Sequence, residues 1–235
     1  MQKPMPPRLT VVGPLERPDH HHLPEQAKCY FWGEYTPYEH TDGKLWNFSA
    51  TNQLIGNLKK KMDRAGYADW RYKQEAIERV GRAFSKLWKW PSVIERHRVA
   101  LVPIPSSKAR GNPMYDPRMN EILLAIGRNL GAQLDIRDCL SFSGQYGPSH
   151  ETDDRPTPDQ LYEDLTFDAV AGRPAEQPGL IFVFDDMLTS GAHYLVATRR
   201  LSEHFPNVQM IGNFVARRIL PNPFANLADD FDAVE

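Results

Sequence analysis

The apolar run GLIFVF, residues 179–184, constrains the fold of this chain more than any other stretch. A strand with one solvated face alternates apolar and polar residues, whereas a strand covered on both faces is apolar almost throughout. Helical patterns at residues 116–131 and 190–205 separate this run from two further apolar stretches, RVALVPIP (98–105) and VQMIGNFVAR (208–217). Strands that alternate with helices predict an α/β fold with a parallel sheet and helices on both faces.

Two helices are expected earlier in the chain. The first covers residues 50–63, where Ser49 or Thr51 is available as the N-cap. The second covers residues 68–90, in which apolar side chains recur at helical spacing on one face, and Pro91 ends it. These helices carry most of the predicted structure in the N-terminal part.

The chain divides near residue 90. Residues 1–40 are rich in Pro, His and aromatic side chains, which predicts irregular or short extended structure. We therefore expect a helical and irregular N-terminal part, residues 1–90, as a candidate hood over an α/β core, residues 91–235. Within the core, QLDIRDCLSF (133–142) predicts a strand and PDQLYEDLTF (158–167) a short helix, with a long polar loop between them.

Composition limits the setting and the partners. The 235 residues include 28 basic and 30 acidic side chains, so the chain has no net positive charge that would attract nucleic acid or an anionic membrane. A local basic patch is still compatible with this composition. Cys29 and Cys139 form no CxxC pair, which favours a reducing compartment. No signal-peptide pattern or run of about 20 apolar residues is present. We expect a soluble, cytoplasmic protein without membrane contact.

Two adjacent carboxylates, Asp185 and Asp186, follow the central apolar run. Ligands of open parallel sheets bind at the carboxyl ends of the strands. The turn Met187–Gly191 then leads into a helix that begins near Ser190, and a helix N-terminus suits a phosphate. Ribose 5-phosphate fits this unit, since its hydroxyls donate to the carboxylates while its phosphate lies on the helix end. The alternative is a solvated turn after an edge strand.

The stretch VFDDMLTSGAH resembles the phosphoribosyl pyrophosphate (PRPP) motif of type I phosphoribosyltransferases. The order of elements over residues 98–217 is similar to the ComF-like branch, in which PSSKARG corresponds to the pyrophosphate loop and RPTPDQ to an Arg-x-Thr-x-x-Gln segment. The resemblance implies a catalytic acidic pair, Asp185 and Asp186. It also implies the following PRPP-binding residues: Met187, Leu188, Thr189, Ser190, Gly191, Ala192, His193, Ser106, Ser107, Lys108, Ala109, Arg110, Arg155 and Thr157.

The same resemblance implies a transferase that passes ribose 5-phosphate from PRPP to a small nitrogenous acceptor and releases pyrophosphate. Asp185 and Asp186 would stabilise positive charge that develops on the ribose. Mg²⁺, bound through PRPP and not through protein ligands, would neutralise the leaving group. Lys108 and Arg110 would bind pyrophosphate, and a flap around Arg155 would exclude water.

Two departures from the family pattern keep a second hypothesis open. The chain lacks the CxxC zinc module that many ComF-like proteins carry at the N-terminus, and His193 stands where the motif usually has Thr or Ser. A non-catalytic sensor of PRPP or a nucleotide, or a ComF-like partner of DNA-handling machinery, is the alternative. PRPP synthesis is disfavoured, because those enzymes resemble two such domains in tandem and one copy is visible here.

Other chemistries have less support. His20, His21 and His22 with Cys29 suggest a metal site, but adjacent histidines in an extended chain cannot all point one way. The signatures of P-loop NTPases, dinucleotide-binding Rossmann domains, HExxH metalloproteases and GxSxG hydrolases are absent. Neither the acceptor base nor the oligomeric state, including a homodimer, follows from the sequence.

Overall fold

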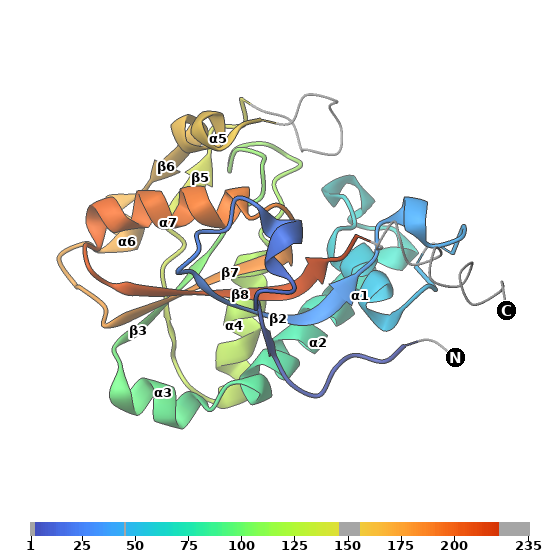
Figure 1. The fold of residues 1–235 in the computed structure, drawn as a ribbon, viewed down its shortest axis with the longest axis horizontal. Coiled ribbons are helices and arrows are strands. Elements are labelled where there is room, and N and C mark those ends of the chain that lie inside the picture. Colours follow the sequence, from blue (N-terminus) through green and yellow to red (C-terminus); the bar gives the residue numbers. More distant parts are fainter. Residues whose placement is uncertain (1–2, 45, 146–155, 221–235) are drawn as a thin grey trace, which may run out of the picture.

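The computed structural model describes residues 3–44, 46–145 and 156–220 and confirms the α/β class (Figure 1). A six-stranded sheet runs through the middle of the molecule in the order β1-β2-β8-β7-β3-β4. Every neighbouring pair is parallel except β1 and β2. The strands are β1 (Thr10–Val11), β2 (Lys28–Tyr35), β3 (Val99–Pro103), β4 (Asp135–Ile136), β7 (Leu180–Leu188) and β8 (Gln209–Arg218).

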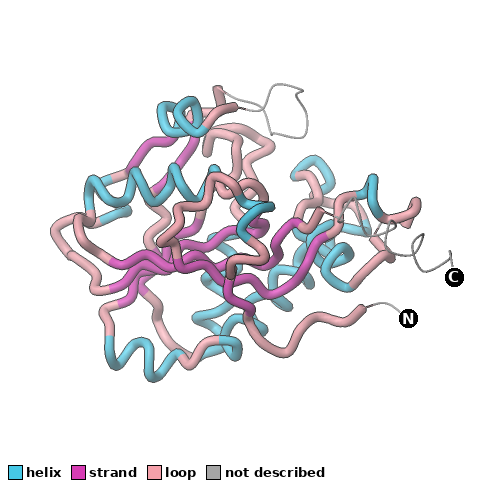
Figure 2. Tube along the Cα trace, viewed as in Figure 1, coloured by secondary structure: helices cyan, strands magenta, loops and turns pink. Residues whose placement is uncertain are grey.

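Helices cover both faces of this sheet, as Figure 2 shows. One face carries α1 (Ala50–Leu58), α2 (Arg71–Leu87), α3 (Trp90–Arg96) and α4 (Arg118–Leu130). The other carries α5 (Pro158–Asp164), α6 (Ala169–Gly172), α7 (Ala192–His204) and a two-stranded antiparallel sheet of β5 (Leu140–Phe142) and β6 (Leu165–Phe167). Four short 3-10 helices lie in the described loops: Arg17–His20, Tyr38–His40, Met62–Arg64 and Ala68–Trp70.

The position of strand β7 between two hydrophobic cores explains why its sequence is apolar at nearly every position. Ile181 and Val183 face the core beneath α7, whereas Phe182 and Phe184 face the core formed with α2 and α4. All four side chains are at most 1 % exposed. Because successive side chains of a strand point to opposite faces, only a strand covered on both sides needs such a run.

The N-terminal part contributes more to the sheet than the sequence indicates. Strand β2 lies between β1 and β8 and pairs in parallel with β8, so a segment expected to be irregular or short extended structure is an interior strand. Cys29, Phe31 and Trp32 of β2 are buried. The strand itself agrees with the short extended structure expected in residues 1–40, whereas its interior place in the sheet was not expected. The division at residue 90 stays a prediction.

Both expected N-terminal helices form. Helix α1 has Ser49 as its N-cap, whose side chain accepts a hydrogen bond from the Asn52 amide at 3.0 Å. Helix α2 buries Ile77, Val80 and Phe84 but ends at Leu87, before the proline expected to end it. That proline lies instead in the first turn of α3, where its missing N–H costs no helical hydrogen bond.

Two segments of the core differ from their expected form. QLDIRDCLSF does not form one strand, because β4 belongs to the central sheet and β5 to the small one. Between them Arg137 is buried, with Nη2 2.8 Å from Asp135 Oδ2 and Nη1 donating to Gly172 O at 2.9 Å. PDQLYEDLTF is helical only to Asp164, and its last residues form β6.

Candidate ligand-binding site

The candidate site lies at the carboxyl ends of β3 and β7, where the chain leaves these neighbouring strands in opposite directions. After β3 it passes through α4 to the edge strand β4, and after β7 it passes through α7 to β8. Because α4 and α7 cover opposite faces, a crevice opens between the two strand ends. Open α/β sheets bind their ligands at such switch points.

Strand pairing shapes this crevice. The β3–β7 ladder reaches the pair Pro103–Phe184, and one further hydrogen bond joins Ile104 N to Phe184 O at 2.8 Å. Strand β7 continues beside β8 as far as Leu188. Asp185 and Asp186 therefore lie within β7, at the point where β3 has turned away, rather than after the strand end.

A pocket of about 560 Å³ occupies the crevice. It brings the loop after β3 together with the acidic pair, although about eighty residues separate them in sequence. Of the predicted site residues, these line the pocket: Ser106, Ser107, Lys108, Asp185, Asp186, Met187, Thr189 and His193. Six others lie outside its lining, namely Leu188, Ser190, Gly191, Ala192, Ala109 and Arg110, as does Thr157. Arg155 lies outside the described residues.

Asp186 is an ionised carboxylate held by two cations. Arg118, at the start of α4, places Nε and Nη2 at 2.8 and 2.7 Å from Asp186 Oδ2. Lys59, just after α1, places Nζ at 3.5 Å from Oδ1. Burial alone would raise the pKa of Asp186, but the charges of Arg118 and Lys59 outweigh it and hold this pKa below its ordinary value.

Asp185 has the opposite tendency. Burial, and then the neighbouring Asp186 charge, raise the pKa of the Asp185 carboxyl above its ordinary value. Its Oδ1 accepts a hydrogen bond from the Asp186 amide at 2.8 Å, which offsets part of that shift. Two adjacent carboxyls whose environments push their pKa values apart are typical of functional sites.

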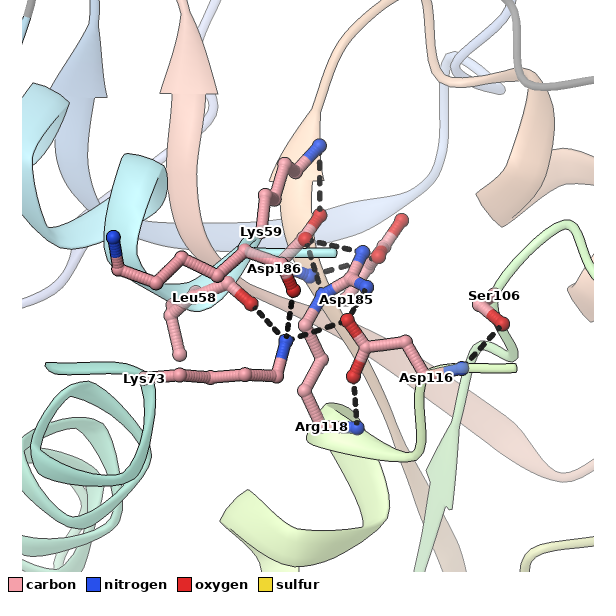
Figure 3. Close-up of polar contacts among 9 residues, drawn as sticks. Leu58, Lys59, Lys73, Ser106, Asp116, Arg118, Asp185 and Asp186 are labelled. Atoms are coloured by element: carbon pink, nitrogen blue, oxygen red, sulfur yellow. Dashed lines mark hydrogen bonds and ion pairs between the residues drawn. The ribbon is translucent and has the colours of Figure 1, made fainter. Parts of the chain in front are cut away.

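A buried network of charges, which the sequence motifs did not predict, supports this pair (Figure 3). Asp116 Oδ2 accepts from Arg118 Nη1 at 2.7 Å and from Lys73 Nζ at 2.6 Å. One signal was available in the sequence. Lys73 falls on the same face of α2 as the apolar Ile77, Val80 and Phe84, and a lysine in an apolar stripe needs a buried partner.

The N-terminal segment forms hydrogen bonds with the turn after β7. The His20 ring Nδ1 hydrogen-bonds to Thr189 O, and the His22 amide donates to Ser190 O at 2.8 Å. Gly191 has φ 89°, and a Cβ there would lie 2.9 Å from Leu23 N. The close backbone approach that calls for glycine therefore comes from the chain itself.

Helix α7 begins directly after this turn. Its N-cap, Gly191, supplies no side-chain hydrogen bond. The first N–H groups of a helix have no intrahelical acceptor, so the start of α7 presents donors and partial positive charge. Thr189 is exposed beside it. This geometry suits an anion such as a phosphate.

Lys108 and Arg110 have different surroundings. Lys108 lines the pocket and forms no ion pair within the described part of the chain. Arg110 makes a two-pronged contact with Asp138, at 2.7 Å from Oδ1 and 2.8 Å from Oδ2, and donates to Leu140 O at 3.0 Å. A contact of Arg110 with pyrophosphate stays a prediction.

The Arg-x-Thr-x-x-Gln segment has a local structural role. Thr157 is the N-cap of α5 and accepts from the Gln160 amide at 3.3 Å, while Gln160 Oε1 accepts from the Thr157 amide at 2.8 Å. This reciprocal pair is a capping box. Pro156 of this segment lines the pocket, as do Leu161 and Asp164 further along α5.

His193 occupies the first turn of α7 with its ring 5.6 Å from that of Phe142. Burial, and then the charge of Lys59, lower its pKa, so the ring is neutral near pH 7. A neutral imidazole in the pocket lining can donate or accept one hydrogen bond, whereas a Thr or Ser hydroxyl at this position would offer a smaller group.

No family model and no curated protein matches this chain. Within the described ranges, no group of three or more His, Cys, Asp or Glu is arranged to hold a metal ion. No described helix combines the length and the apolar content needed to cross a membrane.

Proposed function

We propose that this chain binds PRPP in the pocket between β3 and β7 and transfers its ribose 5-phosphate to a nitrogen nucleophile, with release of pyrophosphate. One observation carries the proposal. The acidic pair of β7, residues 106–108 after β3, and Thr189 and His193 near the start of α7 line a single pocket. These supply acceptors for ribose hydroxyls, a cation for pyrophosphate and donors for a phosphate.

The carboxylates retain room for the ribose. An ionised carboxylate offers about four acceptor positions. Arg118 and Lys59 make three contacts with Asp186, while Asp185 accepts one from the Asp186 amide. Both carboxylates can therefore accept from the 2- and 3-hydroxyls. The charge of Asp186, and that of Asp185 when it is ionised, would stabilise the oxocarbenium-like transition state at the anomeric carbon.

The two phosphate ends of PRPP would lie at opposite ends of the acidic pair. The 5-phosphate would accept from the first N–H groups of α7 and from the Thr189 hydroxyl. Pyrophosphate would lie against Ser106, Ser107 and Lys108. Mg²⁺ would enter with PRPP, held by the ligand's own oxygens, and neutralise the leaving group.

The acceptor would bind beneath the segment after α1. Lys59, Lys61, Met62 and Asp63 line the pocket, so the N-terminal part reaches the site as a hood would. These four lining residues combine charged and apolar side chains. This combination is compatible with a small nitrogenous acceptor.

Calorimetry and product analysis test the proposal. PRPP with Mg²⁺ should bind the wild-type protein, and pyrophosphate should be released with at least one of a panel of nucleobases. Asp185→Asn should bind more weakly, while Asp69→Asn, a change at a carboxylate outside the pocket, should bind like wild type. Failure of the wild-type protein to bind PRPP or ribose 5-phosphate would contradict it.

A PRPP-binding sensor without transferase activity is the second candidate. Three observations favour it: Asp186 is already engaged by two cations, Arg110 is committed to Asp138, and His193 replaces the usual hydroxyl. Binding of PRPP without pyrophosphate release from any acceptor would select this candidate.

A further inference from the structure

Lys73 is the centre of the charge network that surrounds Asp186. Its ammonium group donates to Asp116 Oδ2 at 2.6 Å, and Asp116 in turn binds Arg118, one of the two cations on Asp186. Arg118 is fixed further by its own amide, which donates to Asp116 Oδ1 at 3.1 Å. Lys73 thus reaches Asp186 through two intermediates.

The same ammonium group also fixes the backbone next to the second cation, Lys59. Lys73 Nζ donates to Leu58 O at 2.5 Å and to Lys60 O at 3.1 Å. These two carbonyls flank Lys59, whose side chain contacts Asp186 Oδ1. One buried side chain therefore fixes the backbone on both sides of Lys59 as well as the carboxylate that holds Arg118.

Burial makes this arrangement costly to keep without a function. The Lys73 side chain is 1 % exposed, and that of Asp116 is 10 % exposed. Burial, partly offset by Asp116, lowers the pKa of Lys73, and Glu121 also faces it. Replacing buried charges with apolar side chains is often neutral or stabilising, so stability alone does not explain the network.

We propose that Lys73 is a positioning residue for the candidate site, holding Arg118 through Asp116 and Lys59 through the end of α1, so that both cations stay on Asp186. The carboxylate then keeps its charge and its orientation toward the pocket. The groups that face Asp186 are Arg118, Lys59, Asp185 and His193. The ligand-binding part of this inference rests on the proposed function, and the charge-fixing part does not.

The test uses Lys73→Met, which keeps an unbranched apolar side chain and removes the ammonium group. Lys86→Met is the matched control, because Lys86 is an exposed lysine on the same helix. Lys73→Arg retains a cation and should recover part of the wild-type behaviour. Carboxyl ¹³C NMR on the apo protein, with Asp186→Asn for assignment, follows the titration of Asp186 in each variant.

In Lys73→Met the titration of Asp186 should move to higher pH by about one unit, a tenfold change in its proton affinity. PRPP affinity measured by calorimetry should fall at pH 6 and pH 8 alike, because the Asp186 carboxylate is ionised at both values and has lost its fixed orientation. Lys86→Met should change neither quantity. Asp116→Asn removes the charge that binds Arg118 while keeping Lys73, and it should also move the titration of Asp186 to higher pH. This variant replaces Lys73→Met in the test if Lys73→Met does not fold.

Two outcomes separate this inference from the proposed function. A lower thermal midpoint for Lys73→Met, with the Asp186 titration unchanged, would show that Lys73 is only structural and overturn the inference. Absence of PRPP binding in the wild-type protein would contradict the proposed function, while the NMR titration would still decide whether Lys73 fixes the charge on Asp186.

Discussion

Asp185 and Asp186 are neighbours in the chain, yet their surroundings act on their carboxyl groups in opposite directions. Arg118 and Lys59 stabilise the charge on Asp186, whereas burial and the Asp186 charge oppose ionisation of Asp185. Two repelling carboxylates without partners would both gain stability from neutralisation. The structure instead gives Asp186 two cationic partners. Replacing Asp185 and replacing Asp186 should therefore have different effects on stability.

Asp185→Asn should leave the free energy of unfolding at pH 7 unchanged or raise it, because it removes a buried charge that repels Asp186. Asp186→Asn should lower it by about 3 kcal/mol, the lower end for breaking a buried ion pair, since Arg118 keeps Asp116. Urea denaturation measures both. Equal destabilisation by the two changes would show that the carboxylates act as one structural unit.

The same pair predicts a pH dependence. The folded-state pKa of Asp185 is raised, so the folded protein binds this proton more tightly than the unfolded chain does. Stability from this group is therefore present at low pH and is lost as pH rises from about 4, the ordinary Asp value, through the folded pKa. Asp186 has the opposite sign, so its contribution is lost as pH falls below about 4.

Denaturation curves from pH 4 to 8 test that sign. The stability of Asp185→Asn relative to wild type should increase as pH rises across this range, because the variant lacks the charge that wild type acquires. Asp69→Asn, outside the pocket, provides the control slope. A constant difference between Asp185→Asn and wild type would mean that Asp185 ionises normally.

At the scale of elements, the strand–turn–helix unit of β7 and α7 depends on a glycine that the N-terminal segment also requires. Gly191 has a positive φ and lies against the backbone of Leu23, whereas Gly131, at the end of α4, has φ 63° and open space around its Cβ position. The two glycines share the backbone conformation and differ in their surroundings. They form a natural matched pair.

Gly131→Ala should cost about 1–2 kcal/mol from the left-handed conformation alone and leave ribose 5-phosphate binding unchanged. Gly191→Ala should cost more and weaken that binding, because its Cβ must displace Leu23 and shift the turn. Gly191→Val should abolish binding. Thermal denaturation and calorimetry with ribose 5-phosphate give both readouts. Normal binding by Gly191→Val would place the phosphate away from this turn.

The elements that the sequence predicts best are those with local causes. The run of β7, the Ser49 cap of α1 and the end of α4 at Gly131 each follow from neighbouring residues. Strand β2 was missed because Pro- and His-rich segments flank it and its partner, β8, lies at the other end of the chain. The break at Arg137 depends on a distant carbonyl, that of Gly172.

At the scale of the whole molecule, the site joins segments that lie far apart in sequence. The acidic pair and the loop after β3 were predicted from their motifs, because each motif is local. The cations on Asp186 were not predicted, since Arg118 and Lys59 reach it only after helices α1 and α4 pack on the sheet. Long-range charge pairing has no signature within a short stretch of sequence.

The proposed placement of PRPP can be tested separately at the two ends of the ligand. Lys108 lines the pocket beside β3, whereas the turn after β7 begins α7, so a ligand without pyrophosphate should use only the second. Lys108→Ala should weaken PRPP binding about tenfold, because a charge-assisted contact is worth about 1.5–3 kcal/mol, and should leave ribose 5-phosphate affinity nearly unchanged. Calorimetry with both ligands measures this ratio.

Arg110→Ala provides the contrasting variant for Lys108→Ala. Its guanidinium binds Asp138 and two backbone carbonyls, so its loss should lower the thermal midpoint more than it lowers PRPP affinity. A selective loss of PRPP affinity in Arg110→Ala would instead mean that the side chain leaves Asp138 when pyrophosphate binds. An equal loss of affinity for PRPP and ribose 5-phosphate in Lys108→Ala would show that the loop after β3 does not bind pyrophosphate.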